Sequence, residues 1–123
     1  MKAEELMIGD WVICNHYQDK PFYHQFGLGD FMKGDYVFCE PIPLTPEVLE
    51  KNGFVFHHSD CAYFATVEKQ MASDGIETSY ISVFSRNILE IKTSVSELKM
   101  QCEYVHQLQH ALRLCGIEKS IVV

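Results

Sequence analysis

The pattern of hydrophobic and polar positions predicts strands along much of the second half of the chain. Hydrophobic, β-branched and aromatic residues gather there in short runs, and turn-forming residues separate the runs. Around Ile81 and Val83, apolar side chains alternate with hydroxyl-bearing or aromatic ones, which is typical of an antiparallel strand with one solvated face. We expect a hairpin loop at Ser73-Asp74-Gly75 and a shorter turn at Arg86-Asn87. The predicted strands run from Cys61 to Lys69, from Thr78 to Ser85 and from Ile88 to Lys92.

A repeated pattern organises the first third of the chain. Residues 9–14 read Gly-Asp-Trp-Val-Ile-Cys, and residues 34–39 read Gly-Asp-Tyr-Val-Phe-Cys. Each copy predicts a turn followed by a strand, because Gly-Asp favours turns and the residues after it favour pleated structure. If the two strands are neighbours, Val12 should share a face with Cys14, and Val37 with Cys39.

The stretch between the two copies, residues 17–33, shows neither helical nor strictly alternating periodicity. We expect a hairpin with a long irregular excursion, and a flexible turn at residues 27–30, where a lone G-x-G lacks the context of a nucleotide-binding loop. The aromatic residues of this stretch could fold over the core or face a partner. They are Phe22, Tyr23, Phe26 and Phe31.

Residues 41–54 contain the start and stop signals of a helix. Thr45 is a good N-cap, and Pro46 suits the first helical position because its missing N–H would have no partner there. Gly53 follows the last turn. We therefore predict a connector helix over residues 46–52.

A second helix is predicted over residues 103–115, where hydrophobic residues recur with helical spacing and Gly116 follows as a stop signal. One face should pack on a sheet, and the other should face solvent or a partner. Residues 95–102 fit either a strand or the first turns of this helix. The expected apolar face holds Tyr104, Val105, Leu108, Ala111, Leu112 and Cys115, and the expected polar face holds Glu103, His106, Gln107, Gln109, His110 and Arg113.

These elements predict an α+β fold: a small, mostly antiparallel β-sheet or bent barrel with one connector helix and one C-terminal amphipathic helix. A length of 123 residues suits a single domain, residues 1–123, that buries roughly two thirds of its unfolded surface around one core. The hydrophobic fraction of 47% and the charged fraction of 22% are typical of globular proteins.

Charge and hydropathy narrow the classes of partner. Seventeen acidic and ten basic residues give a net charge of −7, which argues against duplex nucleic acid, because affinity for phosphate comes mainly from Lys and Arg. The chain has no apolar run of about 18 residues, and its first eight residues lack a signal-peptide pattern. We expect a cytoplasmic protein with no membrane contact and no cofactor; its oligomeric state stays open.

The five cysteines lie within apolar patterns and show no C-x-x-C spacing. This predicts reduced thiols, buried or half-buried, with a structural zinc site or a disulfide as the alternatives. Their positions are 14, 39, 61, 102 and 115.

Three segments carry a resemblance to one family. The chain opens with MKAEELMIGD, has PIPLTPEVLEKNGF at residues 41–54 and YVHQLQ at residues 104–109. In these segments it resembles small uncharacterised proteins from prophage and mobile-element regions of gut Bacteroidetes, which typically read MKANELRIGN, PIPLTEEWLLKFGF and YVHQLQNLYFALTGEEL. The matches cover about a third of the chain, in the same order. The resemblance implies an accessory protein of a mobile element and no established activity.

His106 and His110 lie four residues apart on the predicted helix, a spacing at which two imidazoles can bind one metal, and Glu103 lies within one turn. The spacing lacks the glutamate of H-E-x-x-H, and no third ligand is identifiable. Members of the resembling family usually have Asn at the position of His110. We therefore expect no metal here and treat His106, Gln107, Gln109 and His110 as candidate partner-binding residues.

A second weak metal candidate is the run from His57 to Cys61, which holds four types of ligand. Adjacent histidines on an extended backbone point to opposite sides, so only one of them, such as His57, could join Asp60 or Cys61 at one ion. A polar turn leading into a strand explains the run equally well. The sequence shows no local signature of a cysteine hydrolase.

Three functions from different classes follow. The leading hypothesis is a non-enzymatic accessory protein that binds another protein, so the chain leans away from being an enzyme. The second is a small metal- or thiol-dependent hydrolase, which should show a cleft with converging titratable groups. The third is a single-stranded nucleic-acid binder, which should show basic residues beside exposed aromatic ones. The basic candidates are Lys33, Lys51, Lys69 and Arg86.

Overall fold

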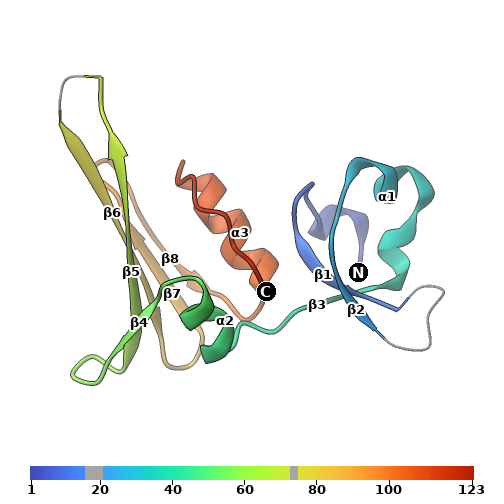
Figure 1. The fold of residues 1–123 in the computed structure, drawn as a ribbon, viewed down its shortest axis with the longest axis horizontal. Helices are drawn as coiled ribbons and strands as arrows, with labels where there is room; N and C mark the ends of the chain where they lie inside the picture. The colour runs from blue at the N-terminus through green and yellow to red at the C-terminus, as the bar shows by residue number, and fades with distance from the viewer. Residues whose placement is uncertain (16–20, 73–74) are drawn as a thin grey trace.

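The computed structural model describes residues 1–15, 21–72 and 75–123. The chain forms two lobes that lie side by side (Figure 1). A three-stranded sheet is the centre of the N-terminal lobe, residues 1–41, and a five-stranded sheet is the centre of the C-terminal lobe, residues 42–123. All strand pairs are antiparallel and neither sheet closes, so the α+β prediction is confirmed and the bent-barrel alternative is wrong.

The five-stranded sheet is a meander in which each strand pairs with the next along the chain. Its three central strands confirm the predicted runs, while the predicted loop residues Ser73 and Asp74 lie outside the described ranges. Residues 97–101 form an edge strand and do not extend the helix. The strands are β4 (Val55–His57), β5 (Ala62–Gln70), β6 (Ile76–Phe84), β7 (Ile88–Lys92) and β8 (Glu97–Gln101).

In the N-terminal lobe the central strand pairs with both of its neighbours, in the order β2-β1-β3. The first Gly-Asp copy forms a strand as predicted, and the expected hairpin with the following segment is present. The strands are β1 (Trp11–Cys14), β2 (Phe22–Gln25) and β3 (Cys39–Pro41).

The second Gly-Asp copy does not form the predicted strand. Asp35–Phe38 is a short 3-10 helix, η2, and the strand begins only at Cys39. Gly34 adopts a left-handed conformation with φ of 72°, and its carbonyl accepts a hydrogen bond from the N–H of Val37, so the backbone turns where an extended chain was expected. Val37 is 62% exposed while Cys39 is 3% exposed, so the two do not share a face. The prediction for the first copy is confirmed, since Val12 and Cys14 are both buried.

The flexible turn expected at residues 27–30 is also wrong, because a helix, α1 (Leu28–Lys33), begins there. Asp30 Oδ2 accepts a hydrogen bond of 2.8 Å from the N–H of Gly27 and lies 2.8 Å from His24 Nε2. The carboxylate thus fixes the start of the helix, where N–H groups otherwise lack partners.

The connector helix is confirmed as α2 (Pro46–Lys51). Thr45 Oγ1 accepts a hydrogen bond of 3.3 Å from the N–H of Val48, so Thr45 is the N-cap. Gly53 has φ of 85°, a conformation that glycine adopts without strain. Leu49 is the buried residue of this helix and packs in the larger apolar cluster.

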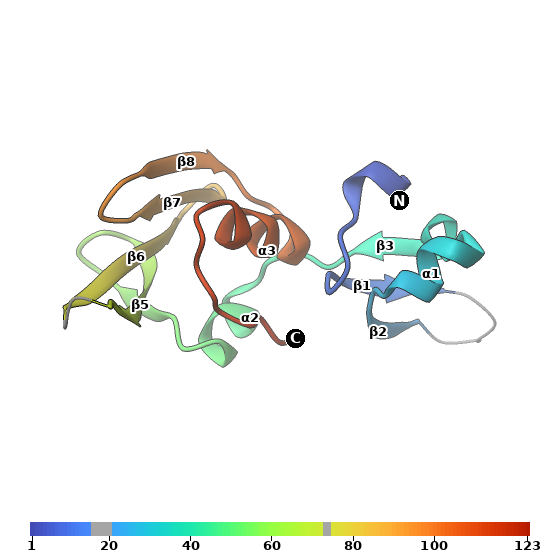
Figure 2. The same cartoon turned by 90° about the horizontal axis from the view of Figure 1, so that it is seen from above.

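The C-terminal helix is confirmed as α3 (Val105–Leu114). Figure 2 shows that α3 lies against one face of the curved five-stranded sheet, and we call this face inner and the opposite face outer. Four residues of the predicted apolar face are at most 3% exposed: Val105, Leu108, Ala111 and Leu112. No helix in the described ranges has both the length and the apolarity to span a membrane.

The buried apolar residues form two clusters, where the sequence led us to expect one core. The larger cluster lies between α3 and the five-stranded sheet. The smaller cluster, inside the N-terminal lobe, consists of Leu6, Val12, Cys14, Phe26 and Cys39. Strand β1 touches both clusters, because alternate side chains point to opposite faces: Val12 packs in the smaller one, and Trp11 and Ile13 pack against the larger one.

The C-terminal tail, residues 117–123, forms no strand and is held by Asn52. Asn52 uses both polar atoms of its side-chain amide: Nδ2 donates to the carbonyl of Val122 at 2.7 Å, and Oδ1 accepts from the N–H of Val122 at 2.9 Å. Ile121 is buried, at 3% exposed. The tail therefore packs against the end of α2.

Candidate functional site

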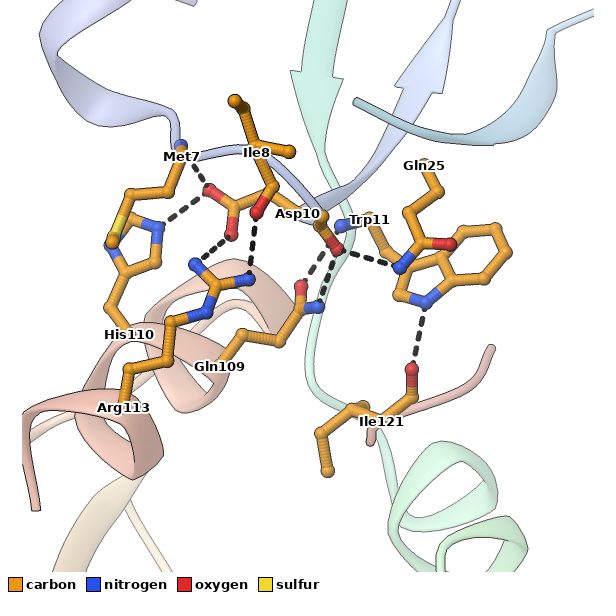
Figure 3. A network of polar contacts seen from close by, with 10 residues as sticks. Met7, Ile8, Asp10, Trp11, Gln25, Gln109, His110, Arg113 and Ile121 are labelled. Atoms are coloured by element: carbon orange, nitrogen blue, oxygen red, sulfur yellow. Dashed lines mark hydrogen bonds and ion pairs between the residues drawn. The ribbon is translucent and has the colours of Figure 1, made fainter. Parts of the chain in front are cut away.

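The polar side of α3 binds the segment that leads into β1, and Asp10 is at the centre of this contact (Figure 3). The Asp10 side chain is 0% exposed. Its Oδ2 accepts a hydrogen bond of 2.8 Å from the N–H of Met7 and lies 2.5 Å from His110 Nε2. Its Oδ1 accepts from Arg113 Nη1 at 3.2 Å, and Arg113 Nη2 donates to the carbonyl of Ile8 at 3.1 Å. The buried carboxylate thus has a charged partner and two further donors, as burial of a charge requires.

Gln109 adds two hydrogen bonds to the same segment. Its Oε1 accepts from the N–H of Trp11 at 2.9 Å, and its Nε2 donates to the carbonyl of Gly9 at 2.9 Å. Trp11 in turn donates from Nε1 to the carbonyl of Ile121 at 2.7 Å. We call the contacts of residues 7–11 with α3 and the tail the lobe junction.

The expectation that His106 and Gln109 face solvent is wrong. His106 is 6% exposed and Gln109 is 8% exposed. The helix turns its polar side toward the N-terminal lobe, which periodicity within one helix cannot reveal. His106 Nδ1 is buried and has no hydrogen-bond partner among the described residues. Burial lowers the pKa of His106, and His110 lowers it further, while Asp10 and Glu5 act in the opposite direction.

The other two predicted partner-binding residues also make contacts within the chain. Gln107 Oε1 accepts hydrogen bonds from the N–H groups of Glu103 and Tyr104, at 2.8 and 3.2 Å, and so caps the start of α3. The side chain of His110 is 29% exposed and contacts Asp10. The structure thus brings Gln109 and His110 into the lobe junction, and the ring of His106 lies 5.5 Å from that of His110, while Gln107 caps the helix start. The sequence predicted Asp10 only as a turn residue. Its role in the lobe junction could not be predicted, because its side-chain partners on α3 lie about a hundred positions away.

A groove of about 670 Å³ runs beside the lobe junction, between Gly9 and the tail. Gln109 and Arg113 line it, but both side chains already bind residues 8–11. The other titratable residues that line the groove, Glu118 and Lys119, belong to the tail.

The second weak metal candidate lies in the C-terminal lobe. His57 ends β4, and Asp60 and Cys61 follow in the turn before β5. Cys61 is exposed and has φ of 50°. Within the described ranges, no three His, Cys, Asp or Glu residues are arranged to hold a metal ion, and this applies to His106 and His110 as well.

The outer face of the five-stranded sheet carries a row of ring side chains. His57 and Phe64 lie on adjacent strands with ring centroids 4.8 Å apart, and Phe64 and Phe84 follow at 6.2 Å. Beside this row, Val55 is 60% exposed and Tyr80 is 55% exposed. We call these five residues the outer aromatic row.

A hollow of about 510 Å³ adjoins the outer aromatic row, and Asp60 and Thr66 help to line it. In Figures 1 and 2 both labelled helices of this lobe, α2 and α3, lie away from the outer face. The alternation of residues 80–85 predicted which side chains of β6 would be solvated. It could not predict the row, because that depends on the register that pairs Phe64 with Ser82 and Thr66 with Tyr80.

Most of the cysteine prediction is confirmed. The five thiols are free; Cys14, Cys39 and Cys102 are buried, Cys115 is half-buried, and only Cys61 is exposed. Burial raises the pKa of Cys102 to about 12, so this thiol stays protonated.

In the aromatic stretch of the N-terminal lobe, some rings fold over the core and others are exposed. Phe26 is 1% exposed and contacts Phe31, with ring centroids 4.6 Å apart. Phe22 and Tyr23, on β2, are 38% and 59% exposed. Residues 17–20 of the stretch lie outside the described ranges.

The four basic candidates for nucleic-acid binding belong to separate parts of the fold: Lys33 in α1, Lys51 in α2, Lys69 in β5 and Arg86 in the turn after β6.

Comparison of the chain with family models, with curated proteins and with solved structures gave no match.

Proposed function

We propose that this protein is a non-enzymatic binding protein that recognises another protein through the outer face of its five-stranded sheet. The observation that carries the proposal is the outer aromatic row next to a hollow, on a sheet face to which α2 and α3 contribute no cover. Tyr80 is exposed, and Phe64 and Phe84 are half-buried. Aromatic groups at a sheet surface are typical anchors for a protein partner, because they bury much area at little cost in side-chain entropy.

The charges around the row favour a partner with apolar and basic side chains. By strand alternation, three carboxylates and two lysines accompany the row on this side of the sheet, and Asp60 adds a fourth carboxylate from the turn before β5; one lysine, Lys92, lies 3.1 Å from Glu90. The face therefore has more acidic than basic residues, and its charge has the same sign as the net charge of −7. An extended or helical segment with an apolar side and flanking Lys or Arg would complement it. The charged residues are Asp60, Glu68, Glu90, Glu97, Lys92 and Lys99.

The same charges disfavour the nucleic-acid alternative, since carboxylates beside stacking groups repel phosphate. The resemblance to mobile-element proteins suggests the biological setting in which a small accessory binding protein would act. The proposed binding surface does not include the four residues of α3, His106, Gln107, Gln109 and His110, because they make contacts within the chain.

The test is affinity capture from cells that carry the gene, followed by titration with the purified captured protein. Val55→Lys and Tyr80→Lys each place a cation in the row at an exposed position, and Val95→Lys, at a position 89% exposed in the turn between β7 and β8, is the matched control. We expect each row variant to keep its melting temperature and to bind the partner at least about tenfold more weakly, a loss of about 1.4 kcal/mol. The control should bind as the wild type does.

The captured protein must also present a segment with apolar and basic side chains. Unchanged affinity in both row variants would contradict the proposal. So would capture of RNA or DNA whose binding the two lysines strengthen, because the sheet would then be a nucleic-acid surface.

A further inference from the structure

Two buried thiols face each other across the small sheet of the N-terminal lobe. Cys14 on β1 is paired directly with Cys39 on β3, and their sulfur atoms lie 3.5 Å apart. Cys14 is 6% exposed and Cys39 is 3% exposed. This site is separate from the outer aromatic row, and the inference goes beyond the proposed function.

The position in the ladder brings the two side chains close. In the neighbouring pair, the N–H of Asn15 donates to the carbonyl of Phe38, which marks that pair as hydrogen-bonded. Because the two kinds of pair alternate along an antiparallel ladder, Cys14 and Cys39 form a non-hydrogen-bonded pair, in which side chains approach most closely. The Cα separation that is usual for such a pair also suits a disulfide bond. Pro41, which has no N–H, occupies the next non-hydrogen-bonded position, opposite Val12.

The N-terminal lobe has a reason to use a covalent link. Its core holds five buried apolar residues, and two of them are these cysteines. Cores of this size give little stability, and small folds commonly gain it from disulfides. A bond between residues 14 and 39 would close a loop that contains β2, α1 and η2, which is most of the lobe.

We propose that Cys14 and Cys39 form an oxidation site that takes a small hydroperoxide and closes to an intramolecular disulfide. One thiolate attacks the O–O bond, which gives a sulfenic acid and releases one water. The second thiol then displaces the sulfenic hydroxyl, forms the S–S bond and releases a second water. Two thiols and one hydroperoxide are thus converted to one disulfide and two waters, or to one water and one alcohol when the oxidant is an alkyl hydroperoxide.

The surroundings make this reaction slow and dependent on opening of the sheet edge. Burial raises the pKa of Cys39 to about 12 and also raises that of Cys14, so few of the thiols are ionised at neutral pH. Strand β3 is an edge strand of three residues, and its opening would admit an oxidant of the size of hydrogen peroxide. The site therefore suits a lasting structural change better than a rapid signal.

The test treats the full chain with hydrogen peroxide in a Cys61→Ser background, which removes the exposed competing thiol. We expect peptide mass spectrometry to find a Cys14–Cys39 link that a reducing agent reverses. The rate should rise about tenfold per pH unit below the thiol pKa. Amide exchange in β2 and α1 should slow after oxidation. Cys102→Ser is the matched control and should link as fast as the parent.

Two single substitutions test whether both thiols are needed for the link. Cys14→Ser and Cys39→Ser must both abolish the link, and circular dichroism of each shows whether the chain still folds. Links that form only in urea, or links to Cys102 or Cys115 at equal yield, would overturn the proposal, and so would overoxidation of one thiol without a link. An oxidised protein whose exchange in β2 and α1 is unchanged would overturn the structural role.

Discussion

At the scale of single residues, Asp10 joins more of the lobe junction than any other side chain that Figure 3 shows. It combines zero exposure with bonds from a backbone N–H, an imidazole and a guanidinium. A buried carboxylate is stable only when such donors compensate for the water it has lost. Its removal leaves the donors without an acceptor.

Asp10→Ala should therefore lower the free energy of unfolding by about 2–4 kcal/mol. This cost is smaller than that of breaking a fully buried ion pair, because the side chains of His110 and Arg113 are 29% and 36% exposed and can form hydrogen bonds to water instead. Urea denaturation measures the change. Asp60→Ala, at an exposed carboxylate, should stay within about 0.5 kcal/mol, and equal effects of the two variants would show that Asp10 has no special role.

His106 should make stability depend on pH. Burial and the neighbouring His110 lower its pKa below the usual value of 6.5, against the opposing effect of Asp10 and Glu5. Above about pH 6.5 the imidazole is neutral in both the folded and the unfolded chain, so its protonation does not change the free energy of unfolding. Below it, the unfolded chain binds the proton and the folded chain resists it, so stability falls until the pH reaches the folded pKa.

The difference between wild type and His106→Gln isolates this effect from the carboxylates that both proteins share. Between pH 7.5 and pH 5, wild-type stability should fall more than that of His106→Gln, while His58→Gln, at an exposed position, should follow the wild type. A steeper fall in His106→Gln would mean that the folded state favours the imidazolium and that the assigned direction is wrong.

At the scale of elements, much of the fold could be predicted, because its signals are local. The caps of α2, the alternation in β6 and the apolar side of α3 are all readable within one short window of sequence. The strand prediction failed at residues 35–38, which have strand-forming side chains yet turn as η2, because Gly34 adopts a left-handed conformation and its carbonyl accepts from the N–H of Val37.

The candidate site was predictable only in part, because its contacts join residues far apart in the sequence. The polar residues of α3 were identified, but the surface they face depends on where β1 packs, about a hundred positions away. The outer aromatic row depends on strand register in the same way.

Leu108 and Leu114 provide a matched test of how α3 is oriented. Leu108 is 1% exposed and Leu114 is 78% exposed on the same helix. Leu108→Ala should cost about 2–5 kcal/mol, because it leaves a cavity in the larger core. Leu114→Ala should stay within about 0.5 kcal/mol. Similar costs for both, measured by thermal and urea unfolding, would show that the helix is rotated differently.

At the scale of the whole molecule, the two lobes form one unit because α3 contacts both. Its apolar side completes the larger core and its polar side binds residues 7–11. Residues 104–109 contact residues 9–11 across the lobe junction, and within the C-terminal lobe the N–H of Val105 donates to the carbonyl of Ile42 at 2.8 Å. The start of α3 is thus bound both to the N-terminal lobe and to the segment that leads into α2.

Gln109→Ala should loosen this connection selectively. The N–H of Trp11 loses its acceptor, so its amide exchange should rise at least about tenfold, with smaller increases along the rest of β1. The amides of β5, β6 and β7 should change little. Gln70→Ala, at an exposed position of β5, is the control and should leave Trp11 unchanged. Equal acceleration in both lobes would contradict the local role of Gln109.

The central claim is that a protein partner covers the outer aromatic row, and hydroxyl-radical footprinting of the free and the partner-bound protein tests it most directly. Aromatic and sulfur-containing side chains are the reactive ones, so Tyr80 and Phe64 report on the row and Met32, 81% exposed on α1, reports on the N-terminal lobe. Our account predicts that binding lowers the labelling of Tyr80 and Phe64 several-fold and leaves Met32 unchanged. Protection of Met32 with unchanged Tyr80 and Phe64 would contradict it.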